Sequence, residues 1–473
     1  MRNLFYKPGD GWPGDFIPFC WQGEHHLFYL KDYRDKEKHG EGTPWFHVGT
    51  RDFTHFIDYG EALARGGPPD SQDRWVFTGC VLEDKDRFHI FYTGHNSRLR
   101  EQGKPQQAVM HATSPDLVTW TKDTQCTLFA DPARYEQHDW RDPFVFWNEE
   151  AGEYWMLLAA RLLEGPEDRR GCTALCASKD LRIWQVREPF WAPALYYTHE
   201  CPDLFRIGDW WYLVYSTFTG TFATRYAMSR TLRGPWIIPK VDTFDAREFY
   251  AAKTASDGRR RFAFGWNARL ADEKDHGSWC WGGSLAVHEI VQRPDGTLAF
   301  KLPDEIDRVF GERMPLRPVS QPGWRTEGET LLCEPTGGFS ACRIAPMPRQ
   351  CKLAATVSWR AGTEACGLLL HASDDLSRYY EVCFEPAANR VSFGRCPDVE
   401  NPSFALERPV DLSAGRAEVK IVAENSVIEI YVNDAVALSA RGYDFTDGSV
   451  GLFVVQGQAT FRDVSVALAQ QTT

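Results

Sequence analysis

Two short patterns recur in step along the first two-thirds of the chain, and this double repeat limits the fold more than any other feature of the sequence. The first pattern is a run of aromatic or aliphatic residues opened by a turn, which is typical of a buried β-strand. Its five copies are GEHHLFYL (23–30), KDRFHIFYTG (85–94), GEYWMLLAA (152–160), GDWWYLVYS (208–216) and GRRRFAFGW (258–266). Taking Phe28, Phe91, Leu157, Val214 and Phe264 as equivalent, the steps are 63, 66, 57 and 50 residues.

The second pattern repeats in phase with the first. Its copies are TRDFTHF (50–56), TSPDLVTW (113–120), SKDLRIW (178–184) and SRTLRGPW (229–236), with apolar anchors 64, 64 and 51 residues apart. Strand-rich units that cannot bury their own faces are typical of β-propellers, which have about 4–8 blades. The sequence therefore predicts an all-β chain that begins with a five-bladed β-propeller. An array of β-sandwiches would explain the number of strands but not the two repeats in phase.

One position in each unit lies 13 to 15 residues before the equivalent strand residue. These positions hold, in chain order, Asp15, Phe77, Asp142, Glu200 and Tyr250. The innermost strands of a propeller line its central channel, so matching starts of those strands meet at one end of the axis. We therefore expect three carboxylates to face one another across a funnel, with Arg141, Phe77, Thr78 and Tyr250 between them.

Three clustered acids repel one another, and burial of an unpaired charge is costly. Glycoside cleavage uses such a group, because one carboxyl with a raised pKa protonates the leaving oxygen while a second attacks or stabilises the anomeric carbon. Arg141 beside Asp142 would hold that acid ionised and could bind substrate hydroxyls. The cluster predicts a glycoside hydrolase, with Asp15, Asp142 and Glu200 as its catalytic residues.

Other site chemistries have weaker support in the sequence. None of these segments carries the DxDxDG pattern of a calcium loop, and the dispersed histidines form no HExxH motif. Cys201 is expected to be a small buried partner and His199 a packing neighbour, and no GxSxG elbow is present. We therefore expect no cofactor and no catalytic metal, while a bound structural calcium is left open.

Several motifs resemble those of glycoside hydrolase family 32, the group of invertases, inulinases and levanases. RDPFVFW (141–147) and ECPDLF (200–205) resemble the RDP and EC signatures of the family, in the same order. VFTGC (76–80) is similar to its FSGS stretch, and Trp45 in PWFHV to its WGH stretch. FYAAKTASDGRRRFAFGW (249–266) resembles the pattern of its fifth blade.

The resemblance implies a retaining mechanism on a five-bladed propeller. Asp15 would then be the nucleophile, Glu200 the general acid/base, and Asp142 the acid that steadies the transition state and binds ring hydroxyls. In a retaining enzyme the nucleophile and the acid/base stand about 5–5.5 Å apart. Substrate binding would fall to the residues that shape the pocket, which are Trp45, Phe77, Thr78, Arg141, Asp203 and Tyr250.

The chain departs from the family pattern around its first acid. Where family members open with a WMNDPNG-type stretch, this chain has GWPGDFIPF (11–19), and Leu30 stands where a sugar-binding Gln is usual. Fructofuranosides such as sucrose or fructo-oligosaccharides are the expected substrates. Open alternatives are an arabinoside or xyloside enzyme of similar fold, a fructosyltransferase, an enzyme that processes difructose anhydrides, and a non-catalytic sugar-binding propeller.

A second domain follows the propeller. We place the propeller at residues 1–311, a Pro-rich linker at 312–324, and a C-terminal β-sandwich at 325–473, where short alternating strands are separated by frequent turns. GLLLHASDDLSRYYEVCFE (367–385) and VIEIYVNDAVALSARGY (427–443) resemble strands of the C-terminal sandwich of family 32. Structural support of the propeller is its expected role, with sugar binding as the alternative.

The net charge and the cysteine pattern indicate which partners the protein binds and where in the cell it is located. The net charge of −12 argues against nucleic acid and membrane surfaces, both of which attract basic patches. The 13 cysteines show no CxxC pair, and the first residues lack the apolar core of a signal peptide. We therefore expect free, mostly buried thiols, a cytoplasmic location and a small carbohydrate as partner, and edge strands leave room for a homo-oligomer.

Overall fold

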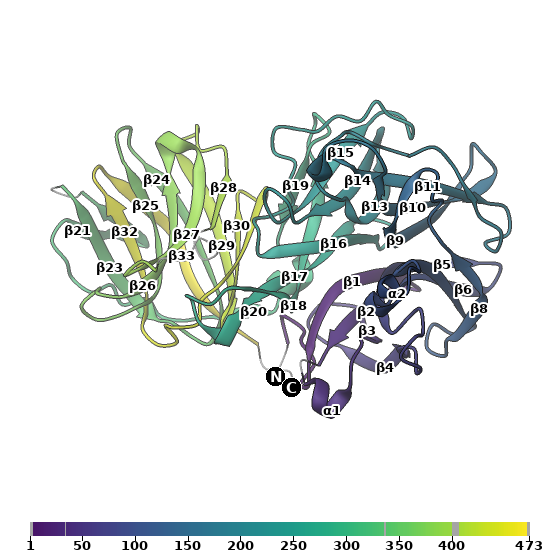
Figure 1. Cartoon of the computed structure of the whole chain (residues 1–473). Helices are drawn as coiled ribbons and strands as arrows, with labels where there is room; N and C mark the ends of the chain where they lie inside the picture. The colour runs from purple at the N-terminus through teal and green to yellow at the C-terminus, as the bar shows by residue number, and fades with distance from the viewer. Residues whose placement is uncertain (1–2, 34, 335–336, 400–405, 471–473) are drawn as a thin grey trace.

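β-strands make up most of the regular secondary structure of the chain, which confirms the predicted all-β class. The computed structural model describes residues 3–33, 35–334, 337–399 and 406–470. Two β-rich regions lie side by side, an N-terminal one in purple to teal and a C-terminal one in green to yellow (Figure 1). The short helices are α1 (Lys36–His39), α2 (Ser97–Glu101) and α3 (Asp304–Asp307). Within the described ranges, none of the helices has the length and apolar character needed to cross a membrane.

The N-terminal region consists of successive antiparallel sheets in which the strands follow chain order. The first contains β1 (Trp12–Trp21), β2 (Glu24–Asp32), β3 (Trp45–Thr50) and β4 (Ile57–Leu63). The second contains β5 (Trp75–Asp84), β6 (Arg87–His95), β7 (Gln107–Ser114) and β8 (Thr121–Leu128). The third contains β9 (Tyr135–Asn148), β10 (Glu153–Leu162), β11 (Gly171–Ser178) and β12 (Gln185–Val186). The fourth contains β13 (Glu200–Ile207), β14 (Trp210–Thr217) and β15 (Ala223–Ser229). The fifth contains β16 (Phe249–Ser256), β17 (Arg261–Leu270), β18 (Trp279–Gln292) and β19 (Leu298–Lys301).

Both sequence repeats correspond to fixed places in these sheets. The strand repeat supplies the second strand of every sheet, and its equivalent residues are completely buried: Phe28, Phe91, Leu157, Val214 and Phe264. The second repeat supplies the turn after the third strand, where Phe53, Leu117 and Leu181 take a positive φ of about 60° and pack inward. The double repeat therefore marks one supersecondary unit used several times.

The first strands of the five sheets contact one another in a closed order. β1 contacts β5, β5 contacts β9, β9 contacts β13, β13 contacts β16, and β16 returns to β1. These contacts lie between separate sheets, and each sheet keeps its own hydrogen-bonded ladder. The first strands therefore surround a common space at the centre of the region.

Each first strand is interrupted by a bulge or irregularity, which lies near the start of the strand in four sheets and at the middle of β9 in the third. The pairing with the second strand shifts after Gly14, Phe77, Arg141, Glu200 and Tyr250. Four residues at these shifts, Asp15, Asp142, Cys201 and Ala251, have a positive φ of 48° to 58°. Positive φ is uncommon for residues other than glycine, and bulges often re-aim side chains beside active sites. An irregularity thus recurs in all five first strands around the centre, with a positive φ in four of them.

The C-terminal region contains two further antiparallel sheets. The first has the order β21 (Trp324–Glu327), β22 (Thr330–Cys333), β33 (Ala459–Ala469), β24 (Gln350–Trp359), β29 (Arg416–Glu424), β30 (Val427–Val432) and β31 (Val436–Arg441), with β20 (Phe310–Arg313) also paired to β33. The second has the order β23 (Phe339–Pro346), β32 (Ser449–Val455), β25 (Ala365–Ala372), β26 (Tyr379–Glu385), β27 (Arg390–Cys396) and β28 (Leu406–Pro409). Apolar side chains of both sheets share one core, as Leu353 and Ile421 of one and Leu368 and Val382 of the other show. The boundaries at 311 and 324 stay a prediction, and β20 spans the first of them.

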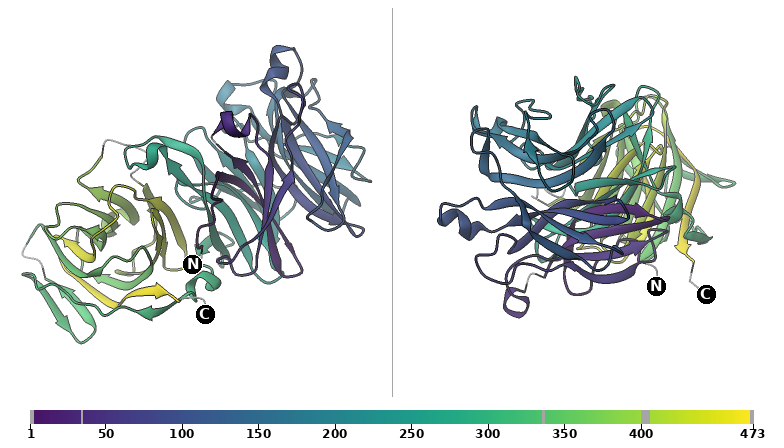
Figure 2. Two further views of the ribbon diagram at one scale, coloured as in Figure 1. Left: turned by 90° about the horizontal axis from the view of Figure 1, so that it is seen from below. Right: turned by 90° about the vertical axis from the view of Figure 1, so that its right-hand side faces the viewer.

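The two regions lie next to each other (Figure 2), and side chains of both pack together where they meet. Val422, Val427 and Tyr431 of the C-terminal region belong to the same buried cluster as Phe249 and Phe264 of the fifth sheet. The buried Arg441 donates hydrogen bonds to the backbone oxygens of Ala268 and Asn267 and to the hydroxyl of Ser284. The C-terminal region therefore supports the fifth sheet directly.

Candidate active site

A cavity of about 350 Å³ opens at the centre of the N-terminal region, where the five first strands meet. Ligand sites commonly have volumes of this order. Its lining contains every first strand: Asp15 of β1, Phe77 and Thr78 of β5, Arg141 and Asp142 of β9, Glu200 and Cys201 of β13, and Tyr250 and Ala251 of β16. The predicted convergence of the three acids on one space is confirmed.

The strand pairing corrects the predicted equivalence of these positions by one residue. Asp15, Thr78, Asp142, Cys201 and Ala251 occupy the matching places within the irregularities, whereas Gly14, Phe77, Arg141, Glu200 and Tyr250 immediately precede them. Asp15 and Asp142 are therefore true equivalents, and Glu200 is equivalent to Arg141. Counting back from the second strand gave the wrong partner because a bulge changes the number of residues between two paired positions.

Gly14 is the one member of the second set that carries no side chain. A Cβ atom at Gly14 would lie 2.5 Å from the ring of Trp281, which comes from β18 and lines the cavity. Such a contact is impossible without displacement of the ring, so the glycine is what admits the indole. Trp281 therefore occupies the place that Phe77, Arg141, Glu200 or Tyr250 occupies elsewhere around the centre.

Asp15 is held by two donors on opposite oxygens. The Thr78 hydroxyl donates to Oδ2 at 2.7 Å, and the Trp266 indole donates to Oδ1 at 3.1 Å. Burial raises the pKa of Asp15 to about 7, the charges of Asp142 and Glu200 add to this rise, and the two hydrogen bonds oppose it. Asp15 is thus a fixed carboxylate that changes its protonation near neutral pH.

Glu200 is bound on both oxygens as well. Arg141 donates from Nη2 to Oε1 at 3.0 Å, and the Tyr250 hydroxyl donates to Oε2 at 2.6 Å. Burial raises the pKa of Glu200 and Arg141 lowers it, with a net rise. The Glu200 side chain remains 21 % exposed, in keeping with its place on the cavity wall. These are the properties of a carboxyl group that can hold a proton and deliver it to a ligand.

Asp142 is fixed by the backbone of the neighbouring first strand. Cys201 donates its backbone N–H to Asp142 Oδ2 at 2.9 Å, and Asp142 donates its own N–H to the Thr93 hydroxyl at 2.8 Å. Burial raises the pKa of the Cys201 thiol well above its ordinary value, so the thiol stays neutral. Cys201 therefore positions Asp142 through its backbone and does not supply a nucleophile.

Two predicted binding residues lie behind the cavity wall and do not line it. The indole of Trp45 is fully buried and donates to the backbone oxygen of Phe77 at 3.1 Å. Asp203 is also buried, and its Oδ2 accepts hydrogen bonds from the backbone N–H and the hydroxyl of Thr254 on β16. Neither residue lines the cavity, and their polar atoms already bind the protein, so their part in substrate binding stays a prediction.

Three cavity residues that lie outside the first strands were missed by the sequence reasoning. Asp32, Thr43 and Trp281 line the cavity together with Leu30, whose replacement of the usual glutamine the sequence did show. Asp32 ends β2, Thr43 precedes β3, and Trp281 lies on β18, so none belongs to the repeated first-strand position. No pattern in the sequence points to them.

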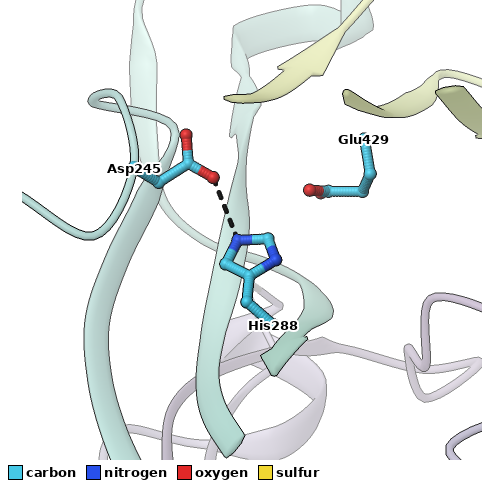
Figure 3. A group of neighbouring side chains, drawn as sticks. All are labelled: Asp245, His288 and Glu429. Carbon is cyan, nitrogen blue, oxygen red and sulfur yellow. Dashed lines mark hydrogen bonds and ion pairs between the residues drawn. The ribbon is translucent and has the colours of Figure 1, made fainter. Parts of the chain in front are cut away.

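A second group of buried polar side chains lies at the junction of the two regions and contains residue types that bind metals (Figure 3). Asp245, His288 and Glu429 have potential ligand atoms within 4.8 Å of one another, the only such group in the described ranges. Their oxygens already have partners, because His288 Nε2 and Ser439 contact Asp245 while Asn267 and Ser439 contact Glu429. The group is therefore a hydrogen-bonded clamp, and nothing in it calls for an ion.

A larger hollow of about 880 Å³ also lies at this junction, but it offers no comparable chemistry. Its lining mixes Arg293, Arg408 and Arg416 with Asp295 and Asp411, and most of these side chains belong to the outer surface. The smaller cavity brings four acids, a guanidinium, a phenol and an indole into contact with the same space. We place the active site in the smaller cavity.

Comparison with known families decides which class of enzyme this site belongs to. The sequence family "Glycosyl hydrolases family 32 N-terminal domain" matches residues 6–296, and the family "Glycosyl hydrolases family 32 C terminal" matches residues 334–467. The chain belongs to glycosyl hydrolase family 32. It is a glycoside hydrolase, as the three clustered acids predicted.

Relatives of this family 32 chain span nearly its whole length at low identity. It is 26% identical to the raffinose invertase of Escherichia coli, over 96% of this chain and 92% of the relative. It is 24% identical to a cell-wall β-fructofuranosidase of Zea mays, over 95% and 88%. Among solved structures, the exo-inulinase of Aspergillus awamori shares the fold with a TM-score of 0.76, at 18% identity over 99% of this chain and 98% of that one. Fructan 1-exohydrolase IIa of Cichorium intybus gives a TM-score of 0.74 at 16% identity, over 100% and 99%.

Proposed function

We propose that this enzyme hydrolyses β-fructofuranosidic bonds with retention of configuration, through a covalent fructosyl–enzyme intermediate. The observation that carries the proposal is the meeting of Asp15, Asp142 and Glu200, from three different sheets, on one cavity that also receives Arg141. The raffinose invertase and β-fructofuranosidase relatives support a fructoside as substrate.

The proposed reaction begins with a proton on Glu200 and none on Asp15. Asp15 attacks the anomeric carbon as the bond to the leaving oxygen breaks, and Glu200 gives its proton to that oxygen. A water then attacks the same carbon, its proton passes to Glu200, and the bond to Asp15 breaks. The product sugar leaves with its original configuration, and both carboxyl groups return to their starting states.

The remaining residues support these steps. Thr78 and Trp266 hold the two oxygens of Asp15, which aims one lone pair at the substrate. Asp142, fixed by the Cys201 N–H, can accept hydrogen bonds from ring hydroxyls that strengthen as positive charge develops on the sugar. Phe77 and Trp281 supply apolar surface on the cavity wall.

The same proposal covers the architecture. We take the five N-terminal sheets as the blades of a five-bladed propeller whose inner strands are β1, β5, β9, β13 and β16, and the two C-terminal sheets as a β-sandwich. A ring of blades explains why residues as distant in the chain as Asp15 and Tyr250 line one cavity. The cytoplasmic location stays a prediction.

The test combines substitution with product analysis. Fresh product from sucrose, followed by NMR, should appear first as the β-anomer of fructofuranose; the α-anomer would contradict retention. Asp15→Asn and Glu200→Gln should each lower kcat by at least about 10²-fold, while Glu149→Gln, on an exposed turn, serves as the matched control. Full activity of Glu200→Gln would overturn the assignment of the acid/base.

A further inference from the structure

Asp139 touches the catalytic guanidinium from the side away from Glu200. Arg141 donates from Nη1 to Asp139 Oδ1 at 2.5 Å and from Nη2 to Glu200 Oε1 at 3.0 Å, so the guanidinium joins the two carboxylates. The distance from Arg141 Nε to Asp142 Oδ2 is longer, at 3.8 Å. Asp139 is not among the residues that line the catalytic cavity, and it lies two residues before the RDPFVFW motif.

Arg161 lies beside the other carboxylate oxygen of Asp139. Its side chain is 1 % exposed, with Nε 2.9 Å from Glu136 Oε2 and 3.8 Å from Asp139 Oδ2. It also donates to the backbone oxygen of Tyr197 at 2.6 Å, and its guanidinium lies 3.4 Å from the centre of the Tyr197 ring. A buried arginine with these partners cannot turn away without losing several charge-assisted bonds. Asp139 therefore lies between two arginines, hydrogen-bonded to Arg141 and within ion-pair distance of Arg161.

We propose that Asp139 is a positioning residue that holds Arg141 against Glu200 and shares its positive charge, so that Glu200 can keep the proton it must deliver. The proposal rests on the role of Glu200 as general acid in the function proposed above. Asp139 acts only through Arg141, because no substrate bound in the cavity would contact it directly.

The charges around Glu200 determine in which direction the pKa of Glu200 changes when the Asp139 charge is removed. A guanidinium paired to one carboxylate favours the ionised form of that carboxylate, whereas a second carboxylate on the same guanidinium weakens this preference. Removal of the Asp139 charge should therefore lower the pKa of Glu200. The other charged or titratable groups that contact Glu200 or interact with it electrostatically stay in place in such a variant, and they are Arg141, Asp142, Asp15, Cys201 and Tyr250.

The experiment measures kcat and KM against pH for the full chain with a fructoside that the wild-type enzyme hydrolyses. In Asp139→Asn the basic limb of kcat/KM, which reports loss of the Glu200 proton, should move to lower pH by roughly one unit. Its kcat should fall roughly 10- to 100-fold because Arg141 is no longer held. Asp139→Glu retains the charge and should bring the limb back toward its wild-type position.

Glu167→Gln is the matched control. Glu167 is an exposed acid that lines the same surface hollow as Asp139 and Arg161. Only its backbone oxygen accepts a bond from Arg161, so its variant removes an equal charge without touching Arg141. The limb should stay in place in this variant. An equal shift in Glu167→Gln, or an unmoved limb in Asp139→Asn with only a lower Tm, would overturn the proposal. Full activity of Glu200→Gln would instead overturn the proposed function, which keeps the two failures distinct.

Discussion

Replacement of Thr78 by valine isolates the hydrogen bond that holds the nucleophile of the proposed mechanism. Thr78 is almost completely buried, and its hydroxyl donates to Asp15 Oδ2 at 2.7 Å. Valine has nearly the same shape and lacks the donor, so the change removes one interaction and leaves the packing in place. Trp266 still donates to the other oxygen of Asp15.

The expected magnitude follows from the strength of a charge-assisted hydrogen bond. Such a bond contributes about 1.5–3 kcal/mol, and one pKa unit corresponds to about 1.4 kcal/mol. Loss of the Thr78 donor should thus raise the pKa of Asp15, already raised by burial to about 7, by about one to two units. The reaction needs Asp15 ionised, so the acid limb of kcat/KM should move to higher pH by that amount.

The assay is the initial rate of fructose release across pH 4 to 10, with Tm followed by calorimetry in the same buffers. Thr43→Val provides the control, because Thr43 lines the same cavity but, among the described residues, its hydroxyl is not one of the hydrogen-bond donors to the three acids. An acid limb that stays at its wild-type position in Thr78→Val, with unchanged Tm, would refute the assigned role of this bond. An equal shift in Thr43→Val would refute it as well.

Three further changes test other contacts of the site and the junction. Tyr250→Phe removes the donor to Glu200 Oε2, so the pKa of Glu200 should rise and the basic limb of kcat/KM should move upward. Burial raises the pKa of Glu429 from 4.5 to about 7, so its stabilising contribution is complete below pH 4.5 and is lost as the pH rises through 7. Glutamine resembles the protonated acid. In Glu429→Gln, the difference between the free energies of unfolding at pH 5 and at pH 8, measured with urea, should therefore be roughly 3 kcal/mol smaller than in the wild type. Trp45→Phe deletes the bond to the Phe77 carbonyl and should raise KM while leaving both pH limbs unmoved, as steady-state kinetics will show.

The repeat in the sequence was enough to predict the strands and the meeting of the acids. Phe28, Phe91 and their equivalents are invariably buried at the middle of a second strand, because each unit must bury one face against its neighbours. A nearly constant distance back from these residues leads to the first strands and therefore to Asp15, Asp142 and Glu200. Local periodicity carries this information directly.

The details of the cavity could not be predicted in the same way. The irregularity at Asp15 and Asp142 depends on backbone torsions that no residue type there demands, so the equivalence was displaced by one position at Glu200. Trp281 enters the cavity only because a distant glycine leaves room for its ring. The contact of Asp139 with the buried Arg161 depends on the pairing of two strands. Each of these depends on packing between segments far apart in the chain.

The three acids of the site stand on three different sheets, and no hydrogen-bonded ladder connects those sheets. The separation between attacking and protonating groups is consequently set by the seams between sheets, which are held by side-chain packing and by single hydrogen bonds such as those from Thr78 to Asp15 and from the Cys201 N–H to Asp142. Mild heating that loosens one seam would abolish turnover while every ladder stays intact. Thermal inactivation should accordingly precede any loss of the far-ultraviolet circular dichroism signal, so turnover is the earliest reporter of damage to this scaffold.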